Sequence, residues 1–228
     1  MTITPTTLIR GAAAAAVAAG LIFIGVNIGH PHMDEASITS TEVVVRNSLK
    51  VLMAALALVG ITGMYVSQIR RNGLLGLIGY LVFAAGYVLL LIPPYIGAFV
   101  LPSIADSNPS FVNDVLALFN GNSPDGDLGL LTTVFQLQGF AYLLGGLVFG
   151  IALFRAGVLA RWAAVLLAVS GLVSVLLAVM PDAFYRFLAF PNGIAMIALG
   201  YSLWSTTRMD TRATETPTDR LVAPAGAE

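Results

Sequence analysis

Six stretches of this chain contain no Asp, Glu, Lys or Arg, and each is long enough to cross a lipid bilayer. They are residues 11–33, 51–69, 72–105, 128–154, 162–181 and 187–207. A soluble domain has about a quarter of its residues charged, whereas this chain has 10% charged and 57% hydrophobic residues. The pattern predicts an all-α integral membrane protein, built as a bundle of six transmembrane helices.

The length of the chain sets its domain organisation. Six spans of about 20 residues use more than half of the 228 residues, so we expect a single transmembrane domain over residues 1–205 and no soluble catalytic domain. The expected spans are about 9–29, 48–69, 73–98, 129–154, 158–180 and 184–205. Residues 206–228, rich in Thr, Pro, Asp, Glu and Ala, are expected to form a disordered cytoplasmic tail.

The first apolar stretch has two interpretations. Arg10 followed by an alanine run resembles the start of a secretory signal peptide. However, a signal peptide has an apolar region of about 7 to 15 residues, and the run here, residues 11–28, is longer and lacks a small-residue cleavage site after it. We therefore favour an uncleaved first helix.

The loops between the spans alternate in charge. On a six-span topology, eight basic residues fall on one side and three, Arg46, Lys50 and Arg186, on the other, which also holds most of the acidic residues. Basic residues are enriched on the cytoplasmic side of membrane proteins, so both termini are predicted to be cytoplasmic and the protein to be a multi-pass protein of the plasma membrane. The excess of Arg over Lys, together with abundant Ala, Gly, Leu and Val, fits a GC-rich bacterial genome.

Several chemistries lack the residues that they need. Cysteine is absent, which excludes thiolate metal sites, iron–sulfur clusters and a cysteine nucleophile. The two histidines, His30 and His32, lie beside Asp34 and Glu35, but a flexible loop does not make a closed metal site. We expect no metal, no haem and no other cofactor. The basic residues form no stripe, so a nucleic-acid partner is not expected.

Polar residues inside a membrane are the first places to look for function. In this chain they fall mainly in the outer halves of the predicted helices, which suggests a polar vestibule open to the outer face. The candidate ligand-binding residues are Asn27, Arg46, Lys50, Tyr95, Gln136, Gln138, Arg186 and Asn192. Gln136 and Gln138 point about 200° apart on a helix, so at most one of them faces the bundle centre, and Gln138 is favoured.

Each of these residues also has a purely structural interpretation. Asn, Gln and Tyr side chains hydrogen-bond neighbouring transmembrane helices. Arg46 and Lys50, one turn apart, can extend to the interface or pair with Asp34, Glu35 or Asp182. Pro93-Pro94 predicts a kink or, more simply, an end of the third helix.

Three further patterns bear on packing. Arg-x-Gly-x-Leu-small occurs at residues 71–76 and again at 155–160, as a weak internal repeat of the two cytoplasmic turns. Residues 109–119 have helical apolar spacing and predict a short amphipathic helix over the mouth of the bundle. Gly73, Gly76 and Gly79, and Gly146 with Gly150, predict close helix contacts within the bundle, with homodimerisation as the alternative.

Residues 145–168, with the sequence GGLVFGIALFRAGVLARWAAVLLA, resemble the signature of small bacterial membrane proteins grouped as domain of unknown function 4386. The resemblance implies six membrane-spanning helices. It implies no activity, cofactor or catalytic residue.

The function that these observations favour is a noncatalytic bundle that supports or regulates other membrane components. Its partners are then the lipid bilayer and either a membrane protein or a second copy of the chain. Coupled pumping is disfavoured because no span carries an acidic residue, Lys or His at mid-membrane. The alternative is binding or transport of a small solute or an apolar ligand through the outer vestibule.

Overall fold

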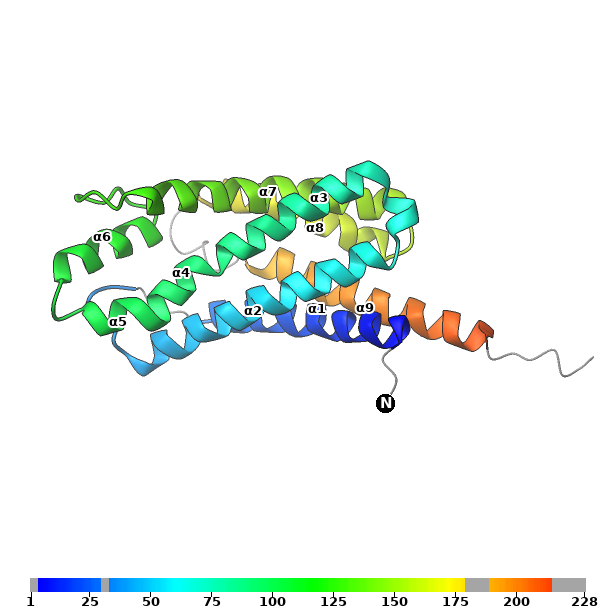
Figure 1. Ribbon diagram of the computed structural model, residues 1–228, viewed down its shortest axis with the longest axis horizontal. Coiled ribbons are helices and arrows are strands. Elements are labelled where there is room, and N and C mark those ends of the chain that lie inside the picture. Colours follow the sequence, from blue (N-terminus) through cyan, green and yellow to red (C-terminus); the bar gives the residue numbers. More distant parts are fainter. Residues whose placement is uncertain (1–3, 30–32, 179–188, 215–228) are drawn as a thin grey trace, which may run out of the picture.

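The computed structural model describes residues 4–29, 33–178 and 189–214, and within them the side chains of 4–29, 33–172 and 190–207. Every regular element in these ranges is a helix (Figure 1). The helices are α1 (Pro5–Asn27), α2 (Thr41–Val66), α3 (Ile69–Leu90), α4 (Ile92–Tyr95), the π-helix η1 (Ile96–Val100), α5 (Leu101–Ile104), α6 (Pro109–Phe119), α7 (Leu130–Ala156), α8 (Arg161–Ala178) and α9 (Ala189–Thr214). Among the described residues, four segments are long and apolar enough to cross a membrane: α1, α2, the run Ile69–Ile104 and α7.

The long helices form a ring in sequence order. Each of α1, α2, α3, α7, α8 and α9 packs against the next, and α9 returns to α1. Short turns join α2 to α3 and α7 to α8, so each of these pairs is antiparallel, as the short connections predicted. Because α1 packs along both α2 and α9, the first apolar stretch is an integral part of the bundle.

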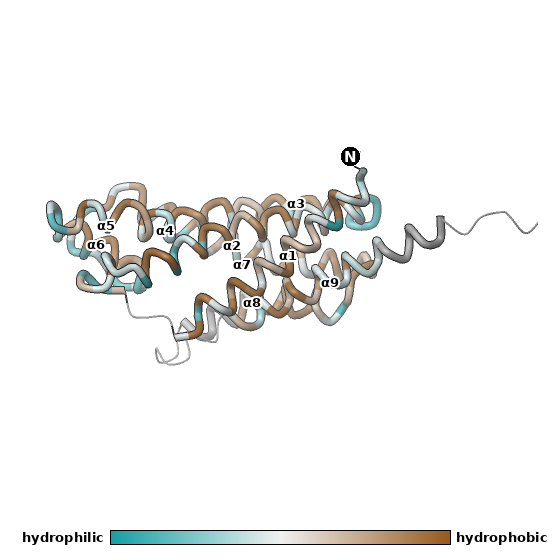
Figure 2. Tube along the Cα trace, turned by 90° about the horizontal axis from the view of Figure 1, so that it is seen from below, coloured by the Kyte–Doolittle hydropathy of each residue, from teal (hydrophilic) through white to brown (hydrophobic). Residues whose placement is uncertain are grey.

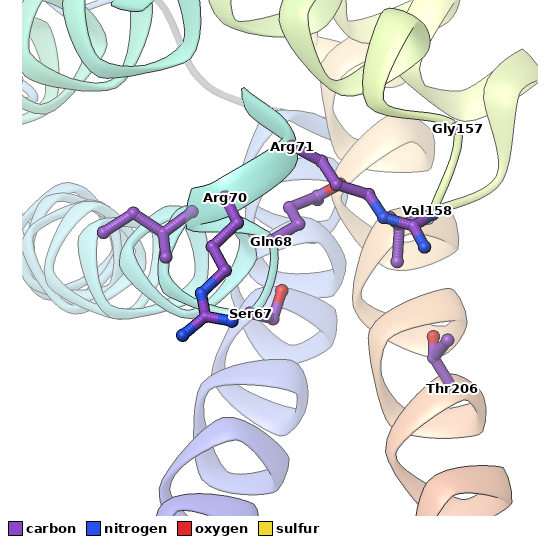
Figure 3. Close-up of a pocket in the computed structure, with 8 residues that line it drawn as sticks. Ser67, Gln68, Arg70, Arg71, Gly157, Val158 and Thr206 are labelled. Atoms are coloured by element: carbon purple, nitrogen blue, oxygen red, sulfur yellow. The ribbon is translucent and has the colours of Figure 1, made fainter. Parts of the chain in front are cut away.

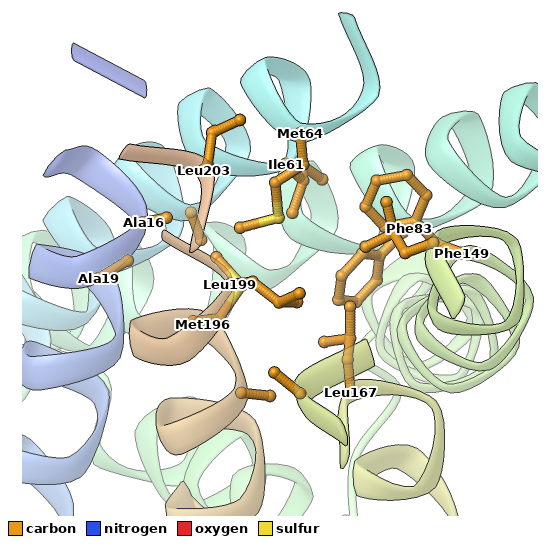
Figure 4. Packing of buried hydrophobic residues seen from close by; sticks show 14 of the residues in the cluster. Ala16, Ala19, Ile61, Met64, Phe83, Phe149, Leu167, Met196, Leu199 and Leu203 are labelled. Carbon is orange, nitrogen blue, oxygen red and sulfur yellow. The ribbon is translucent and has the colours of Figure 1, made fainter. Parts of the chain in front are cut away.

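The centre of the ring is filled by apolar side chains rather than left open. Small residues of α1, such as Ala16 and Ala19, lie in one cluster with larger ones such as Phe83, Phe149 and Leu199 (Figure 4). These side chains are all at most 2% exposed. The apolar core therefore links all six long helices.

Glycines let the helix backbones approach one another closely. A Cβ atom at Gly79 of α3 would lie 2.6 Å from the backbone nitrogen of Phe149 on α7, and one at Gly150 would lie 2.6 Å from the nitrogen of Ala168 on α8. Gly146 faces the ring of Phe83. The predicted packing role is confirmed for Gly79, Gly146 and Gly150, which contact other helices of the chain. A Cβ atom at Gly73 would meet nothing within 4 Å, and one at Gly76 would meet only Asn72 of the same helix.

The expectation that the third helix ends at Pro93-Pro94 is wrong. After a single turn residue at Leu91, helical structure continues through α4, η1 and α5 to Ile104. The two prolines occupy the first turn of α4, where their missing N–H groups leave fewest hydrogen bonds unmade. The π-helical turn ends just before Pro102, which lacks the N–H that an α-helix would need there.

Two other helices extend past the expected membrane spans. Helix α2 begins at Thr41, before the expected span of residues 48–69, with Ser40 as its N-cap accepting from the Val43 N–H. Helix α9 runs to Thr214, so residues 206–214 of the expected disordered tail are helical. Residues 215–228 lie outside the described residues.

The connection before α7 contains the predicted amphipathic helix. In α6, Val112, Val115 and Leu116 are buried against Ile38 and Leu101. This forms a second, smaller apolar cluster at one end of the bundle, separate from the central core. The prediction of a helix covering the bundle mouth is confirmed.

Charge is segregated between the two ends of the bundle. Figure 2 shows a predominantly apolar middle, with hydrophilic residues gathered at both ends. The end formed by the α2–α3 and α7–α8 turns, called the arginine end below, carries Arg10, Arg70, Arg71, Arg155 and Arg161. Within the described side chains, every carboxylate lies at or near the opposite, acidic end: Asp34, Glu35, Glu42, Asp106, Asp114, Asp125 and Asp127.

Candidate functional site

Arg46 has a structural position that accounts for its charge. Its guanidinium donates to the carbonyls of Val26 at 3.0 Å and Ile28 at 2.9 Å, at the C-terminus of α1. It also pairs with Glu42, one turn earlier on α2, at 3.0 Å. Carbonyls at a helix C-terminus lack partners within the helix and favour a cation. Arg46 therefore caps α1, and its carboxylate partner is Glu42 rather than Asp34 or Glu35.

The other predicted vestibule residues are not brought together. Asn27 donates to the Phe23 carbonyl of its own helix at 2.7 Å. Tyr95 is 53% exposed, and its ring is tilted against that of Phe99, with centroids 5.2 Å apart, on the outside of the bundle. Gln136 is exposed. The two cavities described below are lined by other residues.

The remaining predicted residues fall into three groups. Lys50 and Gln138 are half-buried on α2 and α7. Arg186, like His30 and His32, lies outside the described residues. Asn192, in the first turn of α9, is only 3% exposed and is the one predicted residue that is fully buried in the bundle.

Asn192 belongs to a small polar cluster inside the apolar core. It lies beside the hydroxyl of Tyr87 on α3, and the ring of Tyr87 meets Tyr142 of α7 edge-on, with centroids 5.4 Å apart. Both amide atoms of Asn192 and the hydroxyl of Tyr142 are buried without a hydrogen bond of ordinary geometry to any described residue. Such groups are costly in an apolar interior, so this polar cluster is a first candidate site.

A second candidate site is a cavity at the arginine end. It has a volume of about 620 Å³ and is lined by three elements: the α2–α3 turn, the α7–α8 turn and α9 (Figure 3). Its polar lining consists of Ser67, Gln68, Arg70, Arg71 and Thr206. Figure 3 shows Arg71 extending toward Val158, while Arg70 points away from that turn.

A smaller cavity of about 280 Å³ is also lined by Arg71. It is lined by residues that follow Arg71 on α3, including Asn72 and Gly73, and by Arg155 of α7. The two Arg-x-Gly turns of the sequence repeat thus face each other around these cavities. Their glycines, Gly73 and Gly157, both have positive φ, +55° and +65°, a conformation that favours glycine.

Two buried residues that line these cavities, Gln68 and Asn72, each have a side-chain amide oxygen that accepts no hydrogen bond from a described residue. Gln68, 4% exposed, donates to the Met64 carbonyl at 3.1 Å, and its Oε1 has no partner among the described residues. Asn72, 5% exposed, donates to the Tyr65 carbonyl at 3.5 Å, and its Oδ1 is likewise unpartnered in the part of the chain described. Because each amide nitrogen faces a carbonyl, the oxygen must be the free atom.

A metal site finds no support in the described side chains. No group of three or more His, Asp or Glu residues is close enough there to hold an ion. The His30-Pro31-His32 segment is not among them.

The sequence interpretation missed most of the residues of both candidate sites. Tyr87 and Tyr142 look like ordinary members of apolar helices, and their meeting depends on the pairing of α3 with α7. Gln68 and Asn72 flank the α2–α3 turn. The Arg-x-Gly repeat was the signal that could have led to the cavities, since both copies line them.

Comparisons with known proteins add no relative, because no family model, no curated protein and no solved structure matches the chain.

Proposed function

We propose that this chain is a noncatalytic membrane bundle that supports or regulates other membrane components, with six spans and both termini in the cytoplasm of a bacterial cell. The segregation of arginines and carboxylates to opposite ends supports this orientation, because basic residues are enriched on the cytoplasmic side. The ring of α1, α2, α3, α7, α8 and α9 supports six spans, since consecutive helices lie side by side along one bundle.

One observation carries the proposal: four of the described polar residues that suggested an outer vestibule, Arg46, Asn27, Tyr95 and Gln136, are used within the chain or face outward. Arg46 caps α1, Asn27 bonds its own helix, and Tyr95 lies on the outer surface. The interior between the helices is filled by the apolar core. A bundle of this kind offers surfaces to partners rather than a path through its centre.

Those surfaces are apolar and face the surroundings of the bundle. Leu74, Leu81 and Val88, along α3, are 71%, 55% and 49% exposed. Lipid tails satisfy such a surface, and so does the helix of another membrane protein. Because Gly79 and Gly150 are engaged inside the chain, a homodimer would have to use other residues, and we favour a different membrane protein as partner.

The test is native mass spectrometry of the full chain, extracted into native nanodiscs from its own membrane. The proposal expects a second protein at fixed stoichiometry. Exchanging Leu81 and Val88 for Ala should lower that stoichiometry, while exchanging the buried Ile61 for Val should leave it unchanged. A chain that carries a stoichiometric small molecule and no protein partner would contradict the proposal.

The polar cluster of Tyr87, Tyr142 and Asn192 favours a second candidate function, binding of a small polar or amphipathic ligand between α3, α7 and α9. Its unpartnered groups would be satisfied by such a ligand. In the same mass spectra, a bound small molecule should disappear with Asn192→Leu and persist with Asn27→Leu, the matched control. Persistence in both variants would exclude the polar cluster as its site.

A further inference from the structure

The two cavities at the arginine end combine features that select a particular ligand chemistry. Arg70 and Arg71 line the larger cavity, and Arg71 and Arg155 line the smaller one. All three side chains are exposed, and no ion pair joins them to a described carboxylate, since the described carboxylates belong to the acidic end. Arg71 is the residue common to both cavities.

The guanidinium groups are the main free donors of the larger cavity. The Ser67 hydroxyl donates to the Met64 carbonyl and the Thr206 hydroxyl to the Ser202 carbonyl, so their protons are already used. A guanidinium presents a planar fork of N–H donors that matches two oxygens of a phosphate. The lining therefore favours an anion with several oxygens on one centre.

The buried amides of Gln68 and Asn72 add no contact to this choice. Their side-chain oxygens are unpartnered among the described residues but have almost no exposed surface, so a ligand in the cavities meets the arginines. The ligand chemistry therefore follows from the guanidinium groups, which match the oxygens of a phosphate.

The apolar rim of the smaller cavity indicates where the rest of the ligand lies. Leu74 and Leu75 line this cavity and are 71% and 37% exposed, so its wall continues onto the apolar outer face of α3. An acyl chain could follow that face while the head group remains beside Arg71. Basic pockets between transmembrane helices near the cytoplasmic surface bind anionic lipid head groups in this manner.

From this geometry we infer that the paired Arg-x-Gly turns form a binding site, centred on Arg71, for a phosphate ester. The same chemistry occurs in the head group of an anionic lipid and in a soluble polyol phosphate. Leu74 belongs both to this site and to the surface that the proposed function assigns to a protein partner, but the phosphate contact depends on Arg71, which is not part of that surface.

The experiment measures binding to the purified full chain in a neutral detergent. The probes are dioctanoyl phosphatidylglycerol, dioctanoyl phosphatidylmethanol, which has the same charge but no hydroxyl groups, dioctanoyl phosphatidylcholine, and soluble glycerol phosphate. Phosphatidylglycerol and phosphatidylmethanol should both bind more tightly than phosphatidylcholine. Equal binding of phosphatidylcholine would overturn the inference, and glycerol phosphate binding as tightly as the lipid would identify the soluble ester as the ligand.

Variants separate a built site from general positive charge. Arg71→Gln should weaken phosphatidylglycerol binding about tenfold, since a hydrogen bond to a charged group is lost. The matched control is Arg161→Gln, because Arg161 is also exposed at this end but packs over the Phe154 ring, 5.7 Å from its centroid, and lines neither cavity. Equal weakening by both variants would mean that only surface charge matters.

A further variant tests the fold. Arg71→Lys, which retains the charge, checks that lost binding does not reflect lost folding, and circular dichroism should show unchanged helicity in every variant.

Discussion

Helices α3 and α7 lie close together because Gly145 of α7 has no Cβ atom where it meets Phe83 of α3. A Cβ atom at Gly145 of α7 would lie 2.4 Å from both the nitrogen and the Cα of Phe83, and backbone atoms cannot rotate away. We expect Gly145→Ala to destabilise the bundle by about 1–3 kcal/mol, as overpacking does in closely packed cores. The measurement is thermal unfolding in detergent, followed by circular dichroism.

The same helix supplies the control for this prediction. A Cβ atom at Gly139 of α7 meets no heavy atom within 4 Å, so Gly139→Ala introduces a methyl group without a clash. Its stability should stay the same or rise by up to about 1 kcal/mol, because alanine is the better helix former. If the two variants unfold alike, α3 and α7 are not packed as closely as described.

Arg46 allows a second prediction at the scale of one residue. Arg46→Gln removes the two bonds to the α1 carbonyls, and we expect a loss of about 1–3 kcal/mol in the free energy of unfolding. Glu42→Gln removes only the exposed ion pair and should cost less than about 1 kcal/mol. Chemical unfolding in mixed micelles compares the two, and a larger loss for Glu42→Gln would contradict the capping role.

At the scale of the element, α6 is attached to the bundle by its own small apolar cluster. Val115 is fully buried among Ile38, Leu101 and their neighbours, away from the central core. Regions with separate clusters can open without global unfolding. We therefore expect Val115→Ala to speed amide hydrogen exchange across residues 109–119 by about tenfold or more, while exchange in α7 stays unchanged beyond its first turns.

A suitable control for α6 is Asn113→Ala, on its exposed face. This change removes a hydrogen bond to the Glu35 carboxylate at 3.2 Å but no apolar contact, so the exchange rate should change much less. If exchange in α3 and α7 accelerated together with that in α6, the two apolar clusters would form one cooperative unit instead of two.

The sequence predicted which segments are helical better than it predicted the residues at which the helices begin and end. The absence of charge over residues 72–105 sufficed to predict a long apolar helix, but Pro93 and Pro94 suggested that it stops, because their effect depends on where in a turn they fall. In the structure they begin α4, and helical structure continues to Ile104. The tendency of proline to end a helix was outweighed here because the segment is apolar throughout, both where it packs into the bundle and where it faces the surroundings.

For the whole molecule, the candidate sites were harder to predict than the fold. Intramembrane polarity identified Asn192 as unusual, yet its neighbours Tyr87 and Tyr142 come from helices whose pairing cannot be deduced from composition. The arginines were predicted only as a topological signal, because periodicity does not show that residues 71 and 155 meet. That meeting follows from the pairing of α3 with α7 within the ring.

The proposed orientation of the ring is the broadest prediction. The chain contains no cysteine, so single-cysteine variants carry one label each without further changes. Ser107 at the acidic end and Thr7 at the arginine end are both exposed. In intact cells, a membrane-impermeant maleimide should label Ser107→Cys and should label Thr7→Cys only after the membrane is permeabilised. The reverse labelling pattern would mean that the bundle is inverted and that the arginine-lined cavities lie outside the cell. Labelling of both variants in intact cells would rule out an odd number of membrane spans between residues 7 and 107.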